Sequence, residues 1–179
     1  MLSGCISNDI ISKRDYTEIL PNMKSTDLRR DRTMKNYKTI GIAADHAGYE
    51  MKESVKKHLQ SKGYTVSDFG THTAERMDYP DVAHPLALAV EKKEVAIAIA
   101  LCGSGNGISI TLNKHQGVRA AVCWTTELAS LARKHNDANI CSLPARFIDD
   151  LTALQIVDTF LSTDFEGGRH AERVDKIAC

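Results

Sequence analysis

The stretch "VAIAIALCGSGNGISI" (residues 95–110) joins an apolar run to a glycine-rich loop. Its first seven residues are apolar throughout, which is typical of a strand buried inside a parallel sheet. Three glycines then alternate directly after Cys102, and a helix is expected to begin near Ile108. The stretch therefore predicts a strand, a tight turn and a helix, with a thiol at the junction between strand and turn.

The same alternation of strands and helices extends along the chain on both sides of this stretch. Apolar runs predict further strands over 38–45, 64–70, 117–124 and 138–144. Amphipathic spacing predicts helices over 49–63, 78–94, 126–136 and 149–163, with one more in the C-terminal tail. Strands that alternate with helices of this length form a parallel sheet that is covered on both faces. We therefore expect an α/β fold, a single doubly wound Rossmann-like domain with helices on both faces of a parallel sheet.

The composition of the 179 residues bounds the function. Lys plus Arg and Asp plus Glu are both 23, and this zero net charge does not suggest a nucleic-acid or membrane partner. The longest apolar run, "VAIAIALC", is too short to span a bilayer. The five cysteines are scattered and form no CxxC pair, which argues against a zinc site and against a disulfide framework. Free thiols indicate a reducing compartment, the cytoplasm.

Residues 1–33 differ from the rest of the chain. They are polar and charged, and they show no sustained helical or strand period. A second methionine, Met34, stands just before the first predicted strand. We therefore expect residues 1–33 to be a flexible extension, or to lie upstream of the true start at Met34, and residues 34–179 to form the domain.

The chemistry-bearing residues gather where the predicted strands end, and in sheets of this kind ligands bind outside the carboxyl ends of the strands. Asp45 and His46 follow the first strand, Cys102 begins the glycine loop, and Arg146 follows the strand at 138–144. The backbone N–H groups of the loop would form an anion cradle, and they would favour the thiolate form of Cys102. The glycines also fit a tight turn that needs positive φ, and the cysteine also fits a small apolar strand end. From the glycines alone, both interpretations stay open.

Three further features fit either a functional site or an ordinary structural role. Asp45 fits either a polar site or a helix N-cap. His135 and Asn136 close a predicted helix, where a cationic side chain is favoured in any case. Arg169 and Arg173 share one face of a helix, which suits a phosphate or a solvated surface. Together these residues describe a phosphate-binding site with acid–base groups and no metal ligand set.

Six motifs occur in order: "ADHAG" (44–48), "DYPD" (78–81), "CGSGNGIS" (102–109), "NKHQGVRA" (113–120), "RKHNDAN" (133–139) and "FEGGRHAERV" (165–174). On these motifs the chain from Met34 onward closely resembles the type B ribose-5-phosphate isomerases, a family that also includes galactose-6-phosphate isomerase subunits. The resemblance implies an aldose–ketose isomerase of the non-oxidative pentose phosphate pathway, which interconverts ribose 5-phosphate and ribulose 5-phosphate through an enediolate. It also implies no cofactor, no metal, and a homodimer or dimer of dimers with active sites shared across the subunit interface.

The resemblance implies roles for individual residues. Cys102 matches the catalytic base, and His135 matches the acid that helps to open the furanose ring. Residues 103–107 match the loop that holds the enediolate oxygen, and three arginines match residues that contact the sugar phosphate. The substrate-binding residues implied in this way are Asp45, His46, Tyr79, Gly103, Ser104, Gly105, Asn106, Gly107, Asn136, Arg146, Arg169 and Arg173. In relatives, glycine commonly stands where this chain has Pro144 and Ala145, directly before Arg146.

Two other functions are alternatives. The first is isomerisation of a six-carbon sugar phosphate, such as allose or galactose 6-phosphate. The second, more remote, is a non-catalytic sensor of a phosphorylated ligand, which would keep the glycines and arginines but needs neither Cys102 nor His135. Because both residues are present at the ends of predicted elements, we expect an enzyme.

Overall fold

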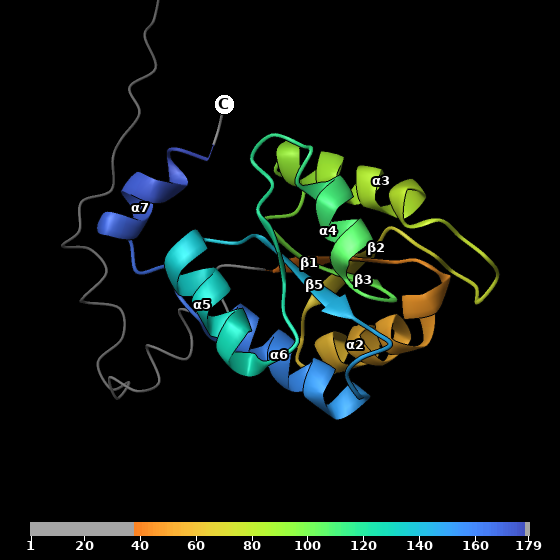
Figure 1. The fold of residues 1–179 in the computed structure, drawn as a ribbon. Coiled ribbons are helices and arrows are strands. Elements are labelled where there is room, and N and C mark those ends of the chain that lie inside the picture. The colour runs from red at the N-terminus through yellow and green to blue at the C-terminus, as the bar shows by residue number, and fades with distance from the viewer. Residues whose placement is uncertain (1–37, 178–179) are drawn as a thin grey trace, which may run out of the picture. The chain divides into compact units, whose positions relative to one another are not determined.

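Five parallel strands form the centre of the computed structural model, which describes residues 38–177 (Figure 1). The strand order is β2-β1-β3-β5-β4. The predicted extension, residues 1–33, and the domain start at Met34 lie outside the described residues. The strands are β1 (Thr39–Ala44), β2 (Thr65–Asp68), β3 (Ile97–Cys102), β4 (Ala120–Val122) and β5 (Ile140–Pro144).

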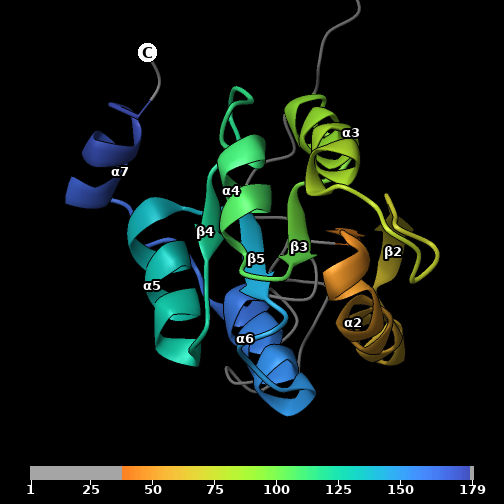
Figure 2. The ribbon, with the colours of Figure 1, turned by 45° about the vertical axis from the view of Figure 1, so that its right-hand side comes forward.

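Helices cover both faces of the sheet, so the prediction of an α/β fold with a parallel sheet is confirmed (Figure 2). Helices α2, α5 and α6 pack on one face, and α3 and α4 pack on the other. The helix predicted to open near Ile108 begins two residues earlier, directly after Gly105. The helical elements are η1 (His46–Gly48), α2 (Tyr49–Ser61), α3 (Tyr79–Glu91), α4 (Asn106–Leu112), α5 (Thr126–Asn136), α6 (Asp150–Ser162) and α7 (Arg169–Val174).

The direction of the strand order reverses between β1 and β3. From β1 the chain first adds β2 on one side. It then returns to add β3 on the other side, β4 at the far edge, and finally β5 between β3 and β4. The register pairs Ala44, the last residue of β1, with Leu101 near the end of β3. In open α/β sheets such a switch point leaves a crevice at the carboxyl ends of the strands. The fold therefore opens a crevice beside Asp45 and Cys102.

The residues of β3 alternate between two apolar clusters. Ile97, Ile99 and Leu101 pack with α2, α5 and α6, whereas the smaller Ala98 and Ala100 face α3 and α4 together with Cys102. Burial of each large apolar side chain contributes about 1.5–3 kcal/mol to folding. The alternation also fixes the position of the thiol, because it directs the Cys102 side chain to the face of the sheet that carries α4.

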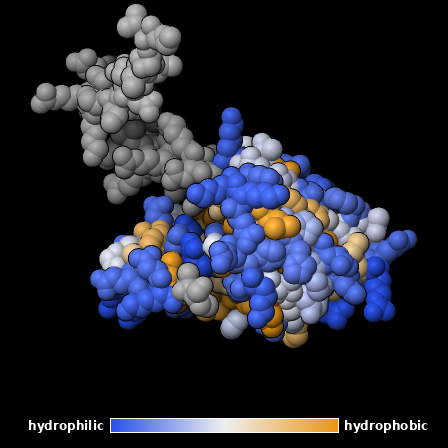
Figure 3. All heavy atoms as spheres, turned by 90° about the horizontal axis from the view of Figure 1, so that it is seen from above, coloured by the Kyte–Doolittle hydropathy of each residue, from blue (hydrophilic) through white to orange (hydrophobic). Residues whose placement is uncertain are grey.

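The outer surface is mostly hydrophilic in the view from above, with small apolar areas between polar ones (Figure 3). Exposed large apolar side chains of the described chain include Leu88, Ile110, Trp124, Phe147 and Leu151. Among the described residues, no helix combines the length and the apolar character that crossing a membrane requires.

Candidate active site

A cavity of about 460 Å³ opens at the carboxyl ends of β1 and β3, where the strand order reverses. An adjacent cavity of about 380 Å³ shares Ser104 and Phe147 with it and adds Asn106 and Trp124. A larger cavity of about 550 Å³ lies around Lys114 and Val174, and none of the predicted site residues lines it. We take the first cavity as the candidate site because eight predicted residues line it: Asp45, His46, Tyr79, Cys102, Gly103, Ser104, Gly107 and Arg146.

The thiol of Cys102 is buried in the wall of this cavity and accepts a hydrogen bond from the glycine loop. The backbone N–H of Gly105 donates to Sγ of Cys102 at 3.1 Å. An N–H directed at sulfur stabilises the negative charge of a thiolate. Gly105 has φ +74°, a conformation that L side chains rarely adopt. Both interpretations of the glycines therefore apply: the turn needs positive φ, and it directs an N–H at the thiol.

Gly107 allows the ring of Tyr79 to lie against the loop. A Cβ atom at position 107 would lie 2.8 Å from Cζ of Tyr79, closer than real Cβ contacts come. Tyr79 begins α3, so this contact closes the cavity between α3 and the start of α4. The first turn of α4 also leaves backbone N–H groups without acceptors inside the helix. The loop therefore combines N–H donors with an aromatic wall.

Asp45 and His46 lie on the opposite wall. Oδ1 of Asp45 accepts hydrogen bonds from the N–H groups of Ala47 (2.9 Å) and Gly48 (3.0 Å), so Asp45 does cap η1 as well as line the cavity. Nδ1 of His46 lies 2.9 Å from the carbonyl oxygen of Met77. Because a carbonyl only accepts, we assign the proton to Nδ1, which leaves Nε2 of the neutral ring able to accept. Met77 was not predicted, because a contact through its carbonyl leaves no signal in its side-chain type.

Arg146 reaches the cavity from the loop after β5. Pro144 continues β5 and pairs with Cys102, and the N–H groups of Ala145 and Arg146 then donate to the carbonyls of Cys102 (2.9 Å) and Gly103 (3.0 Å). The Arg146 side chain lies against Gly103, with Nε 3.4 Å from where a Cβ would stand. The loop therefore delivers Arg146 to the cavity, with Pro144 as the last residue of β5.

Of the six other predicted residues, Gly105 contacts Cys102 and Asn106 lines the adjacent cavity. The other four lie elsewhere: His135 and Asn136 end α5, Arg169 and Arg173 lie on α7, and none of them lines the cavity. Helix α5 ends three residues before β5 begins, whereas Cys102 pairs with the last residue of β5. The five residues of β5 span about 13 Å. Within one chain the predicted site is therefore divided between the two ends of the sheet.

The second group consists of residues on α5, on α7 and between α6 and α7. The rings of His135 and His170 are stacked, with centroids 4.2 Å apart and planes 3° apart. Oε2 of Glu166 lies 3.8 Å from Nε2 of each ring. Burial lowers the pKa of His170, and the positive charges of His135, Arg169 and Arg173 act in the same direction, against Glu166. Glu166 and His170 were not predicted, and the only signal for them is their place in the motif "FEGGRHAERV".

His135, Glu166 and His170 are the one group of three among residues 38–177 that could hold a metal ion, since their ligand atoms all lie within 4.8 Å of one another. An imidazole binds a metal through a lone pair that lies in the plane of its ring. Two parallel rings stacked 4.2 Å apart cannot both hold one ion in their planes. The arrangement therefore does not fit a shared metal ion.

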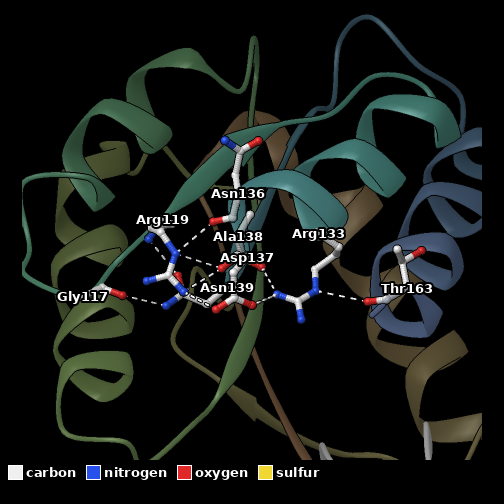
Figure 4. A network of polar contacts seen from close by, with 8 residues as sticks. All are labelled: Gly117, Arg119, Arg133, Asn136, Asp137, Ala138, Asn139 and Thr163. Carbon is white, nitrogen blue, oxygen red and sulfur yellow. Dashed lines mark hydrogen bonds and ion pairs between the residues drawn. The ribbon is translucent and has the colours of Figure 1, made fainter. Parts of the chain in front are cut away.

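Two arginines fix the turn that follows His135 and Asn136 (Figure 4). Asp137 ends α5 in the left-handed region, at φ 44° and ψ 42°. Its carboxylate accepts from Arg119 Nη2 (2.8 Å) and from Arg133 Nη1 (2.9 Å). Arg119 Nη2 also donates to the Asp137 carbonyl (2.7 Å), and Arg119 Nε donates to the Asn136 carbonyl (3.1 Å). This clamp holds the end of α5 that presents His135 and Asn136.

Comparisons with known proteins identify a family and solved structures that match most of the chain. A family model described as Ribose/Galactose Isomerase matches residues 40–177. Ribose-5-phosphate isomerase B of Escherichia coli (strain K12) is 44% identical over 140 residues, which cover 78% of this chain and 94% of that protein. A structure of ribose-5-phosphate isomerase B from Clostridium thermocellum is similar with a TM-score of 0.77 at 50% identity, covering 78% of this chain and 94% of that one. The Mycoplasma genitalium enzyme with bound ribulose-5-phosphate has a TM-score of 0.75 at 41% identity, covering 78% and 93%.

Proposed function

The chain belongs to the ribose/galactose isomerase family, and we propose that it is a ribose-5-phosphate isomerase, which interconverts ribose 5-phosphate and ribulose 5-phosphate through an enediolate. The observation that carries the proposal is the thiol of Cys102, held in the cavity wall with the Gly105 N–H directed at it. The reaction moves a proton between two carbons of one sugar, so it balances without an oxidant or a reductant.

Cys102 is the base in this mechanism. As a thiolate it removes the proton from C2 of the open-chain aldose, and the resulting thiol returns a proton to C1, while the hydroxyl proton of O2 passes to O1. The electron pair of the broken C–H bond moves into the enediolate, whose oxygens then carry negative charge. N–H donors preorganised toward such an oxygen lower the barrier by about 3–4 kcal/mol each. The loop over residues 103–107 supplies these donors beside the base.

The other residues bind and open the sugar. His135 donates a proton to the ring oxygen of the furanose, which releases the open-chain aldehyde that Cys102 needs. Arg146, Arg169 and Arg173 bind the phosphate, because a guanidinium matches phosphate oxygens through paired N–H groups. The sugar hydroxyls contact Asp45, His46 and Tyr79 of the cavity walls, together with Asn136 from the end of α5.

One substrate requires two copies of the chain. Cys102 and His135 lie at opposite ends of the sheet, so the cavity of one copy needs the end of α5 and the α7 arginines of another copy. A two-fold pair of identical chains completes two such sites at once. Trp124 and Phe147, which are 54% and 75% exposed beside the cavity, supply apolar surface for this contact. We therefore assign a homodimer, or a dimer of dimers, with shared active sites.

The same chemistry suggests where the reaction takes place. A thiolate base must stay reduced, and the cytoplasm keeps thiols reduced. Cys102, Cys123 and Cys141 are all free in the structure. We assign the protein to the cytoplasm and to the non-oxidative branch of the pentose phosphate pathway, where the two pentose phosphates are exchanged.

An isomerase assay on three substrates tests the reaction. We expect the highest kcat/KM with ribose 5-phosphate, and lower values with allose 6-phosphate and galactose 6-phosphate. A preference for a six-carbon substrate would keep the reaction class and overturn the choice of substrate. Binding of the three phosphates without turnover of any would overturn the enzyme and favour a sensor.

A mixing experiment tests the shared site. Cys102→Ser and His135→Asn proteins are each expected to be inactive. When the two are unfolded together and refolded as a mixture, one site in each mixed dimer regains both wild-type residues, so activity recovers to about a quarter of wild type. A double variant that carries both changes in one chain, refolded in the same way, is the control and stays inactive. No recovery in the mixture would place both residues in the site of one chain.

A further inference from the structure

The stacked rings of His135 and His170 hold one proton more easily than two. Their centroids are 4.2 Å apart, and two imidazolium charges at this distance repel each other. Interacting titratable groups this close lose their protons in separate steps that belong to the pair. Over part of the pH range the pair therefore carries a single proton, and the question is which ring keeps it.

Burial disfavours the protonated form of His170. Its side chain is 7% exposed, whereas that of His135 is 39% exposed. Nε of Arg169 donates to Nε2 of His170 at 3.5 Å, and an imidazolium has no lone pair with which to accept this contact. Burial also lowers the pKa of His170. His170 is therefore the neutral ring of the pair, and the proton remains on His135.

Glu166 balances an otherwise positive environment. The charged groups around the pair are Lys134 on α5, Glu166 between α6 and α7, and Arg169 and Arg173 on α7. The N–H of Glu166 donates to the Lys134 carbonyl at 3.1 Å, which holds this residue beside the end of α5. Its carboxylate lies 3.8 Å from Nε2 of both rings. Arg169 and Arg173 act to lower the pKa of His170 and Glu166 acts to raise it, so Glu166 is the counter-charge beside the two rings.

From this geometry we propose that Glu166 and His170 are positioning residues that keep the proton of the pair on Nε2 of His135. His170 provides a flat, neutral surface against which the His135 ring is held, and Glu166 supplies the compensating charge. The inference rests on the proposed function, in which His135 is the acid that opens the furanose ring. It explains how that acid stays protonated beside two arginines that bind the phosphate.

Titration of the histidine ring signals by NMR tests the proposal without any assay of activity. The full chain has seven histidines, and the signals lost in His135→Asn and His170→Asn proteins identify the two rings. We expect the His135 signal to titrate at higher pH than the His170 signal. Glu166→Gln should move the His135 midpoint to lower pH, because it removes the negative charge 3.8 Å from Nε2. Glu172→Gln removes the same charge from α7 at a residue with no ion pair to either ring, and it should leave the midpoint nearly unchanged.

Two results would overturn the proposal: a His170 signal that titrates above that of His135, or an unchanged His135 midpoint in the Glu166→Gln protein. A kinetic measurement separates this outcome from failure of the proposed function. In the Glu166→Gln protein the alkaline limb of the kcat/KM profile should move to lower pH with the His135 midpoint, which a merely structural role of Glu166 would not produce. Full turnover by His135→Asn would instead remove His135 from the reaction, while the titration would still report on the pair.

Discussion

The N–H of Gly105 donates to Sγ of Cys102 across 3.1 Å, three residues along the chain. This contact depends on φ +74° at Gly105, directly before the first residue of α4. A Cβ at position 105 would also meet Val122 Cγ1 at 3.0 Å and the backbone nitrogen of Pro144 at 3.3 Å. The conformation of the loop and the environment of the thiol are therefore fixed by the same glycine.

Replacing Gly105 with alanine is expected to lower kcat by about 10–100-fold with a small change in KM, because the added Cβ displaces the N–H that stabilises the thiolate form of Cys102, and this contact does not bind the substrate. Gly63→Ala is the matched control. Gly63 also has positive φ, +87°, but nothing lies within 4 Å of its Cβ position. Steady-state kinetics and thermal unfolding of both proteins make the comparison. If Gly105→Ala kept wild-type kcat, the N–H would have no part in the reaction.

Cys102→Ser is expected to bind ribose 5-phosphate and to lose at least about a hundredfold in turnover, since a hydroxyl is a far weaker base than a thiolate at neutral pH. Cys123→Ala is the control, because Cys123 is a free thiol buried in the core outside the cavity. Its turnover should stay near wild type. Calorimetric binding and initial rates separate the two effects. Near-normal turnover by the serine variant would show that another group is the base.

Arg173→Ala is expected to raise KM with kcat little changed, because the phosphate is remote from the proton that moves. Loss of one charge-assisted contact should cost about 1.5–3 kcal/mol, or roughly ten- to a hundredfold in kcat/KM. Lysine should rescue only in part, since an ammonium lacks the paired donors of the guanidinium. Lys176→Ala removes an exposed charge nearby and serves as the control. An unchanged KM would make Arg146 the first candidate for the phosphate.

A chain that starts at Met34 is expected to fold and to isomerise normally, because residues 1–33 lack hydrophobic periodicity and the family match begins at residue 40. Circular dichroism, size-exclusion chromatography and the isomerase assay compare this chain with the full one. Loss of solubility or activity would show that the first 33 residues are part of the domain.

The sequence predicted the fold because the apolar runs and helical spacings coincide with elements that the sheet buries. The rule that ligands bind at strand ends selected Asp45, Cys102 and Arg146, and the structure places all three in one cavity. Each is adjacent to a buried strand, so local sequence fixes its position. The rule about strand ends needed only the prediction that the strands are parallel, because their carboxyl ends then lie at the same edge of the sheet.

The contacts at the other end of the sheet could not be predicted. The stack of His135 on His170 depends on how α7 packs against α5, and neither helix specifies this packing alone. Asp137 occupies a left-handed position that few non-glycine residues adopt, and two arginines 14 residues apart in sequence stabilise it. Its motif, "RKHNDAN", indicated only a cationic end of a helix. Tertiary packing decides these details.

A buried network of ion pairs joins α2 to the end of β2, and it gives the last prediction. Lys52 is 0% exposed, and its Nζ lies 2.8 Å from Oδ2 of Asp68 and 2.8 Å from Oε1 of Glu53. Lys56 contacts the same oxygen of Asp68 at 2.6 Å, and the N–H of Gly70 donates to Oδ1 at 3.0 Å. Burial acts to raise the pKa of Asp68, but these hydrogen bonds outweigh it, and the pKa lies below its usual value.

Asp68→Asn should therefore destabilise the protein by about 3 kcal/mol at pH 7, the lower end for a broken buried pair, because Glu53 still pairs with Lys52. The folded-state pKa of Asp68 lies below the unfolded value of about 3.9, so the stabilisation is complete above that pH and disappears as pH falls through the folded-state pKa. Denaturant unfolding from pH 7 to pH 2 should show the two proteins converging at the acid end. Asp158→Asn, which changes more exposed contacts with Lys62 and His58, should cost less than about 1 kcal/mol. Equal costs for the two variants, or a difference between wild type and Asp68→Asn that persists at pH 2, would show that the charge of Asp68 does not stabilise this edge of the sheet.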